Sequence, residues 1–237
     1  MRTVDDLTTV PEPAWPALEA ELRSNPQVTV LPIDTPAGRD SLHRLQVSAG
    51  SRLGALALHT GGLLVDDGWL RVLGGGTDGL PSLAEANGLP GDERPPAALL
   101  VGHDVLGGRF EVNGPDPAAA GRPGDPGEVC YFGPDTLEWA PMGVGHGVWL
   151  SWLAQGGTAR FYESLRWPGW PEETRALPLT HGLTVYPFLW SQEAHQDLAA
   201  TSRQPAPLPE LFALQEEFAA RFGTEPAATA LHVQVVD

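Results

Sequence analysis

The side chains that most often bind metals or transfer protons are sparse in this sequence. Seven histidines are present, but no two are three or four residues apart, and neither HExxH nor HxH occurs. Histidines that share a metal from one helix need such spacing, so the sequence gives no local support for a metal site. His103 and Asp104 could form an acid–base pair, but they precede Gly107 and Gly108, and a turn-forming aspartate is the better interpretation.

The other candidate reactive groups have simpler explanations. Cys130 stands between Val129 and Tyr131 in a predicted strand, which indicates a buried, unreactive thiol, and a lone cysteine excludes an internal disulfide. Ser151 is not framed by the GxSxG motif of serine hydrolases. Paired carboxylates from distant segments leave no trace in one sequence and stay open. We therefore expect no catalytic residue, no metal ligand and no cofactor.

Aspartates in turns are candidates for recognition. Asp66 and Asp67 precede Gly68, and adjacent residues of a strand point to opposite faces. A turn therefore explains this pair better than a metal site does. Because turns run over the surface, we expect Asp66, Asp67 and Asp104 to form an exposed acidic rim.

Eight tryptophans are the second notable surplus. Trp69 fits a strand, whereas Trp167, Trp170 and Trp190 lie in the proline-containing stretches WPGW and YPFLW. Most tryptophans belong to a core, but a rigid loop can also present a ring to a partner. The predicted partner-binding residues are Asp66, Asp67, Trp69, Asp104, Trp167, Trp170 and Trp190.

The charge balance narrows the class of partner. Fourteen arginines stand against thirty acidic residues, which gives a formal net charge of −16. Such a field repels phosphate backbones and anionic lipids, so we expect neither nucleic acid nor a membrane as partner. A solvated surface is the simpler explanation of this charge, and a surface that meets a basic protein is the more specific alternative. The opening MRTVDDLTTV lacks the apolar core of a signal peptide, and we expect a cytoplasmic protein. The sequence does not indicate an oligomeric state.

Apolar periodicity predicts an α+β fold, with an antiparallel sheet flanked by helices. Alternating residues indicate strands at 63–65, 69–73, 99–101, 109–113, 129–131 and 137–139. Helical spacing indicates helices at 15–22, 35–49, 51–60, 148–153 and 208–222, a short helix around 161–167, and an edge strand at 183–188. The residues expected to face inward from the central strands are Phe110, Val112, Val129, Tyr131, Leu137 and Trp139. We expect one domain over 1–237, with 224–237 a loose tail or a terminal strand.

Five segments carry a resemblance to known families: HTGGLLVDDGWLRVLG, LLVGHDVLGGRFEVNG, GEVCYFGPDTLEW, FYESLRWPGW and YPFLW. From Trp15 to Phe218 the chain resembles an uncharacterised bacterial family, domain of unknown function 2625, which implies no activity. More distantly the pattern resembles the SUKH superfamily, an α+β fold of antiparallel strands flanked by helices. Many SUKH members are immunity proteins that neutralise toxins, so this resemblance implies a binding role and supplies no catalytic residues.

Two hypotheses follow from the sequence. The first is a non-enzymatic binding protein, in its most concrete form an immunity-like protein that meets a basic toxin through an acidic face and aromatic anchors. The second is a small-ligand-binding protein or enzyme with an aromatic-lined pocket. A shallow acidic face favours the first, and a deep cleft with convergent carboxylates or histidines favours the second.

Overall fold

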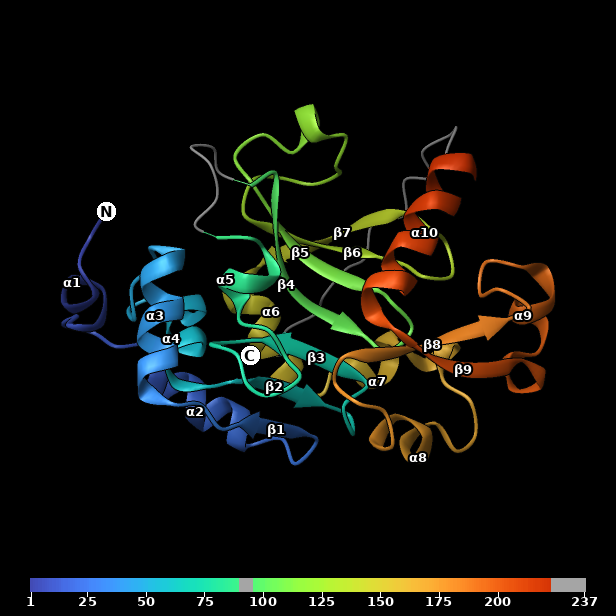
Figure 1. Cartoon of the computed structure of the whole chain (residues 1–237), viewed down its shortest axis with the longest axis horizontal. Coiled ribbons are helices and arrows are strands. Elements are labelled where there is room, and N and C mark those ends of the chain that lie inside the picture. The colour runs from blue at the N-terminus through green and yellow to red at the C-terminus, as the bar shows by residue number, and fades with distance from the viewer. Residues whose placement is uncertain (90–95, 223–237) are drawn as a thin grey trace.

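A seven-stranded antiparallel sheet forms the centre of the protein (Figure 1). The computed structural model describes residues 1–89 and 96–222, so the predicted tail at 224–237 lies outside the described residues. Each strand pairs with the next one in the chain, and all pairs are antiparallel. The strands are β1 (Val28–Leu31), β2 (Gly62–Val65), β3 (Leu70–Leu73), β4 (Ala98–Asp104), β5 (Arg109–Asn113), β6 (Glu128–Phe132) and β7 (Trp139–Gly145).

A second, two-stranded sheet and several helices surround the first sheet. β8 (His181–Tyr186) pairs with β9 (Ser202–Pro207) in antiparallel orientation. The helices are α1 (Val4–Thr8), α2 (Trp15–Arg23), α3 (Thr35–Leu45), α4 (Arg52–His59), α5 (Leu83–Ala86), α6 (His146–Ala154), α7 (Thr158–Phe161), α8 (Trp170–Arg175), α9 (Gln192–Gln196) and α10 (Leu208–Phe222). Short 3₁₀ turns are η1 (Ala118–Ala120), η2 (Glu163–Leu165) and η3 (Leu198–Ala200). The predicted antiparallel α+β class is confirmed.

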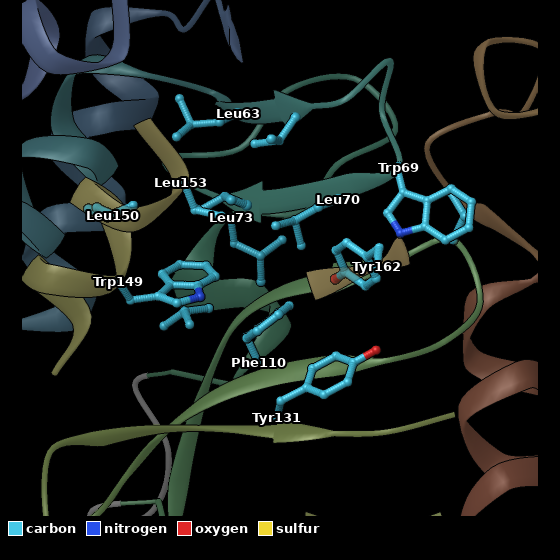
Figure 2. Packing of buried hydrophobic residues seen from close by; sticks show 14 of the residues in the cluster. Leu63, Trp69, Leu70, Leu73, Phe110, Tyr131, Trp149, Leu150, Leu153 and Tyr162 are labelled. Atoms are coloured by element: carbon cyan, nitrogen blue, oxygen red, sulfur yellow. The ribbon is translucent and has the colours of Figure 1, made fainter. Parts of the chain in front are cut away.

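One face of the large sheet carries the main hydrophobic core (Figure 2). Cross-strand neighbours on this face form a row from Leu63 through Val72, Gly102 and Phe110 to Tyr131. α6 covers the row, and its Trp149 ring lies 5.1 Å from the Phe110 ring. Successive strand residues point to opposite faces, so the alternating pattern of the sequence is what assembles this face.

The opposite face is covered by α10 and the β8–β9 sheet. Its cross-strand row runs from Leu64 through Arg71, His103 and Arg109 to Phe132. Phe212 of α10 contacts His103 edge-on, with ring centroids 5.9 Å apart, and the Arg109 guanidinium lies 5.2 Å from the Phe212 ring. In Figure 1, α10 crosses in front of the central strands while α6 lies behind them. Both faces are therefore covered, and the second one buries charged side chains.

Most predicted elements are present, with local corrections. Phe110, Val129 and Tyr131 are buried in the antiparallel sheet as predicted, but Val112 and Trp139 are only half-buried. Leu137 is buried but lies in a turn with φ of 59° rather than in a strand.

Three further details differ from the expectation. Val148 of α6 is 44% exposed instead of facing the core. The helix expected around 161–167 is split into α7 and the 3₁₀ turn η2. β8 ends at Tyr186, because Pro187 has no N–H with which to continue a ladder.

Candidate functional site

Three of the four predicted tryptophans meet in one cluster at the β2–β3 turn. Trp69 is fully buried, and its ring centroid lies 5.5 Å from that of Trp167 and 5.3 Å from that of Trp170. Tyr162 contacts Trp69 from α7's C-terminal side at 5.6 Å (Figure 2). The Arg166 guanidinium completes the cluster, 4.3 Å from the Trp170 ring. This cluster joins two segments about a hundred residues apart in the sequence, as the Arg166–Asp66 ion pair does.

Two acids of the predicted rim have local partners in the same region. Asp66 forms an ion pair with Arg166, and its residue is 7% exposed. Asp67 accepts from Arg175 through both carboxylate oxygens, at 2.8 Å from Nε and 3.2 Å from Nη2. Both aspartates have positive φ, 51° and 56°, a conformation that aspartate tolerates better than most residues. The DDG turn is thus held by arginines from the 158–175 segment.

Asp104 is fully buried, so its predicted place on an exposed rim is wrong. Its Oδ1 accepts hydrogen bonds from the backbone N–H groups of Leu106 and Gly108, at 2.9 and 2.8 Å, and its Oδ2 accepts from the Tyr131 hydroxyl at 2.7 Å. Burial raises the pKa of the Asp104 carboxyl, although these hydrogen bonds oppose the rise. The residue does form the predicted turn, but α10 and β8 cover that turn and remove it from water.

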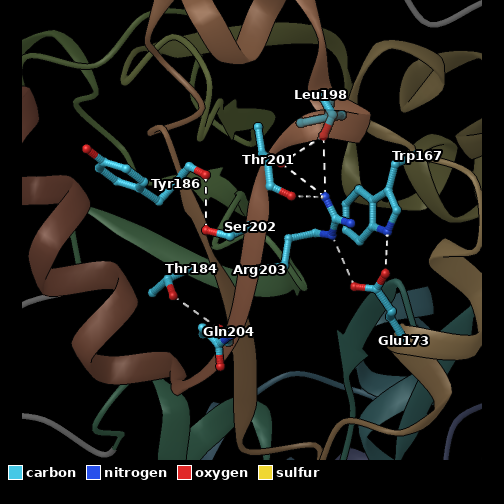
Figure 3. Close-up of polar contacts among 9 residues, drawn as sticks. All are labelled: Trp167, Glu173, Thr184, Tyr186, Leu198, Thr201, Ser202, Arg203 and Gln204. Carbon is cyan, nitrogen blue, oxygen red and sulfur yellow. Dashed lines mark hydrogen bonds and ion pairs between the residues drawn. The ribbon is translucent and has the colours of Figure 1, made fainter.

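Trp167 is also buried, at 2% exposure, and is fixed by the β8–β9 sheet (Figure 3). Its indole N–H donates to Glu173 at 2.9 Å, and Arg203 donates to the other oxygen of the same carboxylate at 3.1 Å. The Arg203 guanidinium lies 4.5 Å from the Trp167 ring and also donates to the carbonyls of Leu198 and Thr201. Of the predicted partner-binding residues, Trp69, Trp167, Asp66 and Asp104 are therefore buried. These four side chains do not form an exposed contact surface.

Trp190 lies elsewhere, in a row of aromatic rings that we call the aromatic platform. Trp190 stacks on Phe188 with centroids 4.6 Å apart and planes 8° apart, and Phe218 of α10 lies 4.9 Å from Trp190. Tyr186 and Phe222 extend the row at its two ends, and they are 68% and 61% exposed. The platform consists of Tyr186, Phe188, Trp190, Phe218 and Phe222.

Sequence reasoning identified one member of the platform and missed four. A signal was present, because Phe218 and Phe222 stand four residues apart on a helix and Tyr186, Phe188 and Trp190 alternate. What the sequence does not state is that the two segments meet. The hollow beside Phe188 and Trp190 has only about 20 Å³, so these rings pack on one another and leave no ligand-sized pocket.

A large hollow lies beside the glycine-rich loop at 74–79. It has a volume of about 650 Å³, and its lining includes Asp34, Asp78 and Glu85 but no arginine or histidine among the described residues. Glu85 already caps α5 through Ser82. The hollow therefore has the wrong charge for an anion, although a run of glycines could otherwise form an anion-binding nest.

Burial keeps two histidines and the cysteine in their neutral forms near neutral pH. Burial lowers the pKa of His103 and of His146 to about 3, so both rings are neutral. Burial raises the pKa of the Cys130 thiol to about 11, which keeps it protonated. Among residues 1–89 and 96–222, no three His, Cys, Asp or Glu side chains form a group that could hold a metal ion. Within the same ranges, no helix is long and apolar enough to cross a membrane.

Sequence comparison with known proteins finds relatives along nearly the whole chain. The family described as "Protein of unknown function DUF2625" matches residues 4–211. The chain is 35% identical over 227 residues to the uncharacterised protein YbfG of Escherichia coli K12, which covers 94% of this chain and 99% of that protein. An uncharacterised protein of Haemophilus influenzae is 28% identical over 211 residues, 86% of this chain and 88% of that protein. No solved structure matches the chain.

Proposed function

This chain belongs to the DUF2625 family, and we propose that it is a binding protein whose contact surface for a basic partner protein is the aromatic platform. The exposed ends of the platform carry the proposal, because Tyr186 and Phe222 keep 68% and 61% of their surface in water. Large contiguous apolar patches rimmed by polar residues mark interaction sites on soluble proteins. The cytoplasmic location predicted from the sequence belongs to the same proposal.

The platform has the properties of an energetic centre in an interface. Its inner rings are fixed by mutual stacking, with Phe218 5.3 Å from Phe188 and 4.9 Å from Trp190. A partner that covers already ordered rings loses little side-chain entropy on binding. Tryptophan and tyrosine are also the residues most enriched among those that dominate binding energy.

The charge around the platform supports a basic partner. Exposed Glu193 of α9 lies three residues after Trp190, and exposed Glu210 lies on α10, whereas exposed Glu217 of α10 is paired with Arg221. The whole chain carries a formal charge of −16. An acidic rim accelerates encounter with a basic protein, whereas the aromatic centre lengthens the lifetime of the complex.

The most specific form of the proposal is an immunity-like role against a basic toxin. It depends on the sequence resemblance to the SUKH superfamily, together with the acidic charge. A toxin-like reading frame next to the gene would support it, and a metabolic operon would count against it.

The test compares two surface variants in the same capture experiment. Tyr186→Ser with Phe222→Ser removes the two exposed rings, and Val148→Ser is the matched control because Val148 is an exposed apolar residue, 44% in water, on α6. We expect wild type and Val148→Ser to retain one basic protein from extracts of the source cell, and the double variant to lose it. Binding of that purified protein is then measured at low and high salt, where the association rate should fall as salt rises. Capture of nucleic acid, or equal affinity of the double variant, would refute the proposal.

A further inference from the structure

Arg71 carries a positive charge into the covered face of the sheet without a carboxylate partner. It is 1% exposed, and among the described residues no acidic oxygen lies within 4 Å of its guanidinium. Its Nη1 donates to the carbonyl oxygens of Leu179 and His181, at 2.9 and 2.5 Å, but its Nε has no partner. Asp104 follows Arg71's cross-strand neighbour His103 and so points to the other face.

A buried unpaired charge is unusual, because the free-energy cost of removing a charge from water is offset only by an opposite charge or by full hydrogen bonding. Burial lowers the pKa of Arg71 to about 10, so it stays protonated at neutral pH. His103 beside it is neutral and supplies no compensating charge. The Asp104 carboxyl raises the pKa of Arg71 through space but forms no ion pair with it, so the guanidinium has no negative charge in direct contact among the described residues.

Arg71 lines a cavity of about 230 Å³ that could admit such a charge. Thr174 of α8 lines the same cavity, is 2% exposed, and its Oγ1 also has no hydrogen-bond partner. Two buried side chains from separate elements, each with one unused hydrogen-bonding atom, thus line the same small space. Leu64, Leu177 and Leu179 form the apolar part of its wall, and the Asp67–Arg175 ion pair also lines it.

We infer that this cavity binds a small organic monocarboxylate, with its carboxylate on Arg71 and on the Thr174 hydroxyl and its short alkyl part against Leu64, Leu177 and Leu179. A single negative charge fits because the other lining arginine, Arg175, is already paired with Asp67. The volume suits a ligand of a few heavy atoms, below the roughly 300 Å³ of a drug-sized pocket. This site is separate from the aromatic platform, and neither proposal depends on the other.

Butyrate is the probe, titrated at constant ionic strength into the full chain while thermal unfolding and heats of binding are recorded. Thr174→Val removes the hydroxyl and keeps the shape. Thr158→Val is its matched control, because Thr158 is 1% exposed with an equally unpartnered Oγ1 but does not line the cavity. We expect saturable stabilisation of wild type and of Thr158→Val, and about tenfold weaker binding by Thr174→Val.

A second pair of variants tests the location. Thr29 is an exposed lining residue of β1, so Thr29→Tyr should obstruct the cavity without disturbing the core, whereas Val30→Tyr places the same ring on the opposite face. Butyrate should lose its effect in the first variant and keep it in the second. The inference is overturned by no saturable response, by phosphate or chloride acting as well as butyrate, or by equal binding in Thr174→Val and Thr158→Val.

Discussion

The Tyr131 hydroxyl donates a hydrogen bond of 2.7 Å to the Asp104 carboxylate, and both side chains lie in the interior at 5% and 0% exposure. Asp104 ends β4 and Tyr131 lies in β6, so the bond spans the strand between them. Asp104 also accepts from two backbone N–H groups of the β4–β5 turn. One carboxylate thus fixes the turn and ties it to a strand two positions away.

Removing the Tyr131 hydroxyl should destabilise the fold. Tyr131→Phe keeps the ring on Phe110 but leaves a buried carboxylate oxygen without its donor, which costs about 1–3 kcal/mol. Tyr186→Phe is the control, because Tyr186 is 68% exposed, and its unfolding free energy should change by less than about 0.5 kcal/mol. Urea unfolding measures both variants. Equal stability of Tyr131→Phe and wild type would mean that the hydrogen bond contributes nothing.

Gly102 should resist substitution because two elements meet there. A Cβ on Gly102 would lie 3.0 Å from the Arg71 carbonyl oxygen and 3.4 Å from Cη2 of Trp149. We expect Gly102→Ala to cost about 1–3 kcal/mol through displacement of β3 or α6. Gly145→Ala is the matched change in the same sheet, since its Cβ would meet only a carbonyl at 3.5 Å. A smaller loss of stability for Gly102→Ala than for Gly145→Ala would contradict this packing.

Arg203 should hold β9 against the rest of the chain. Its Nε donates to Glu173, its Nη1 donates to two backbone carbonyls and to the Thr201 hydroxyl, and its guanidinium covers Trp167. Arg203→Met removes these bonds and leaves Glu173 partly unpaired, so we expect a loss of about 1–3 kcal/mol. Faster amide exchange in 202–207 is the specific readout. If the amide exchange rates of 202–207 stayed unchanged while the whole protein lost stability, Arg203 would not be what fixes β9.

Local patterns predicted the strands but not what covers them. The alternation at 109–113 and 129–131 determines which residues face the core, and those strands form as expected. The sequence predicts an exposed Asp104 because the pattern around it shows only the turn, whereas the helix that covers this turn begins about a hundred residues later. Gln215 of α10 donates to the carbonyl of Leu106 in that turn, at 2.7 Å. No spacing rule connects residues so far apart.

The same limit applies to the candidate sites. The sequence indicates a rigid proline-containing stretch at WPGW, but whether Trp167 is a surface ring or a buried one depends on Arg203 and Glu173, which come from other elements. Arg71 reads as a polar residue in an amphipathic strand, and only the structure shows that its face is covered. The sequence alone therefore does not predict that this face buries a charge.

His103 and His146 should each lower the stability of the fold as the medium is acidified from neutral pH. Burial lowers the pKa of each to about 3 in the folded protein, whereas in the unfolded chain histidine has a pKa of about 6.5. Below that value the unfolded state binds more protons than the folded state, so the free energy of unfolding declines by up to about 1.4 kcal/mol per pH unit for each histidine. The decline continues until the pH reaches the folded pKa near 3.

Substitution of one histidine isolates its share of this slope. His103→Leu should reduce the decline of stability between pH 7 and pH 5, because an apolar side chain beside Phe212 cannot take up a proton. His195→Leu is the control, since His195 is exposed on α9. Buried Asp104, with its raised pKa, gains stability on acidification, so the comparison is between variants at each pH and not between pH values of one protein. Urea unfolding across this range supplies the slopes. Identical slopes for His103→Leu and wild type would show that His103 does not titrate differently in the folded and unfolded states.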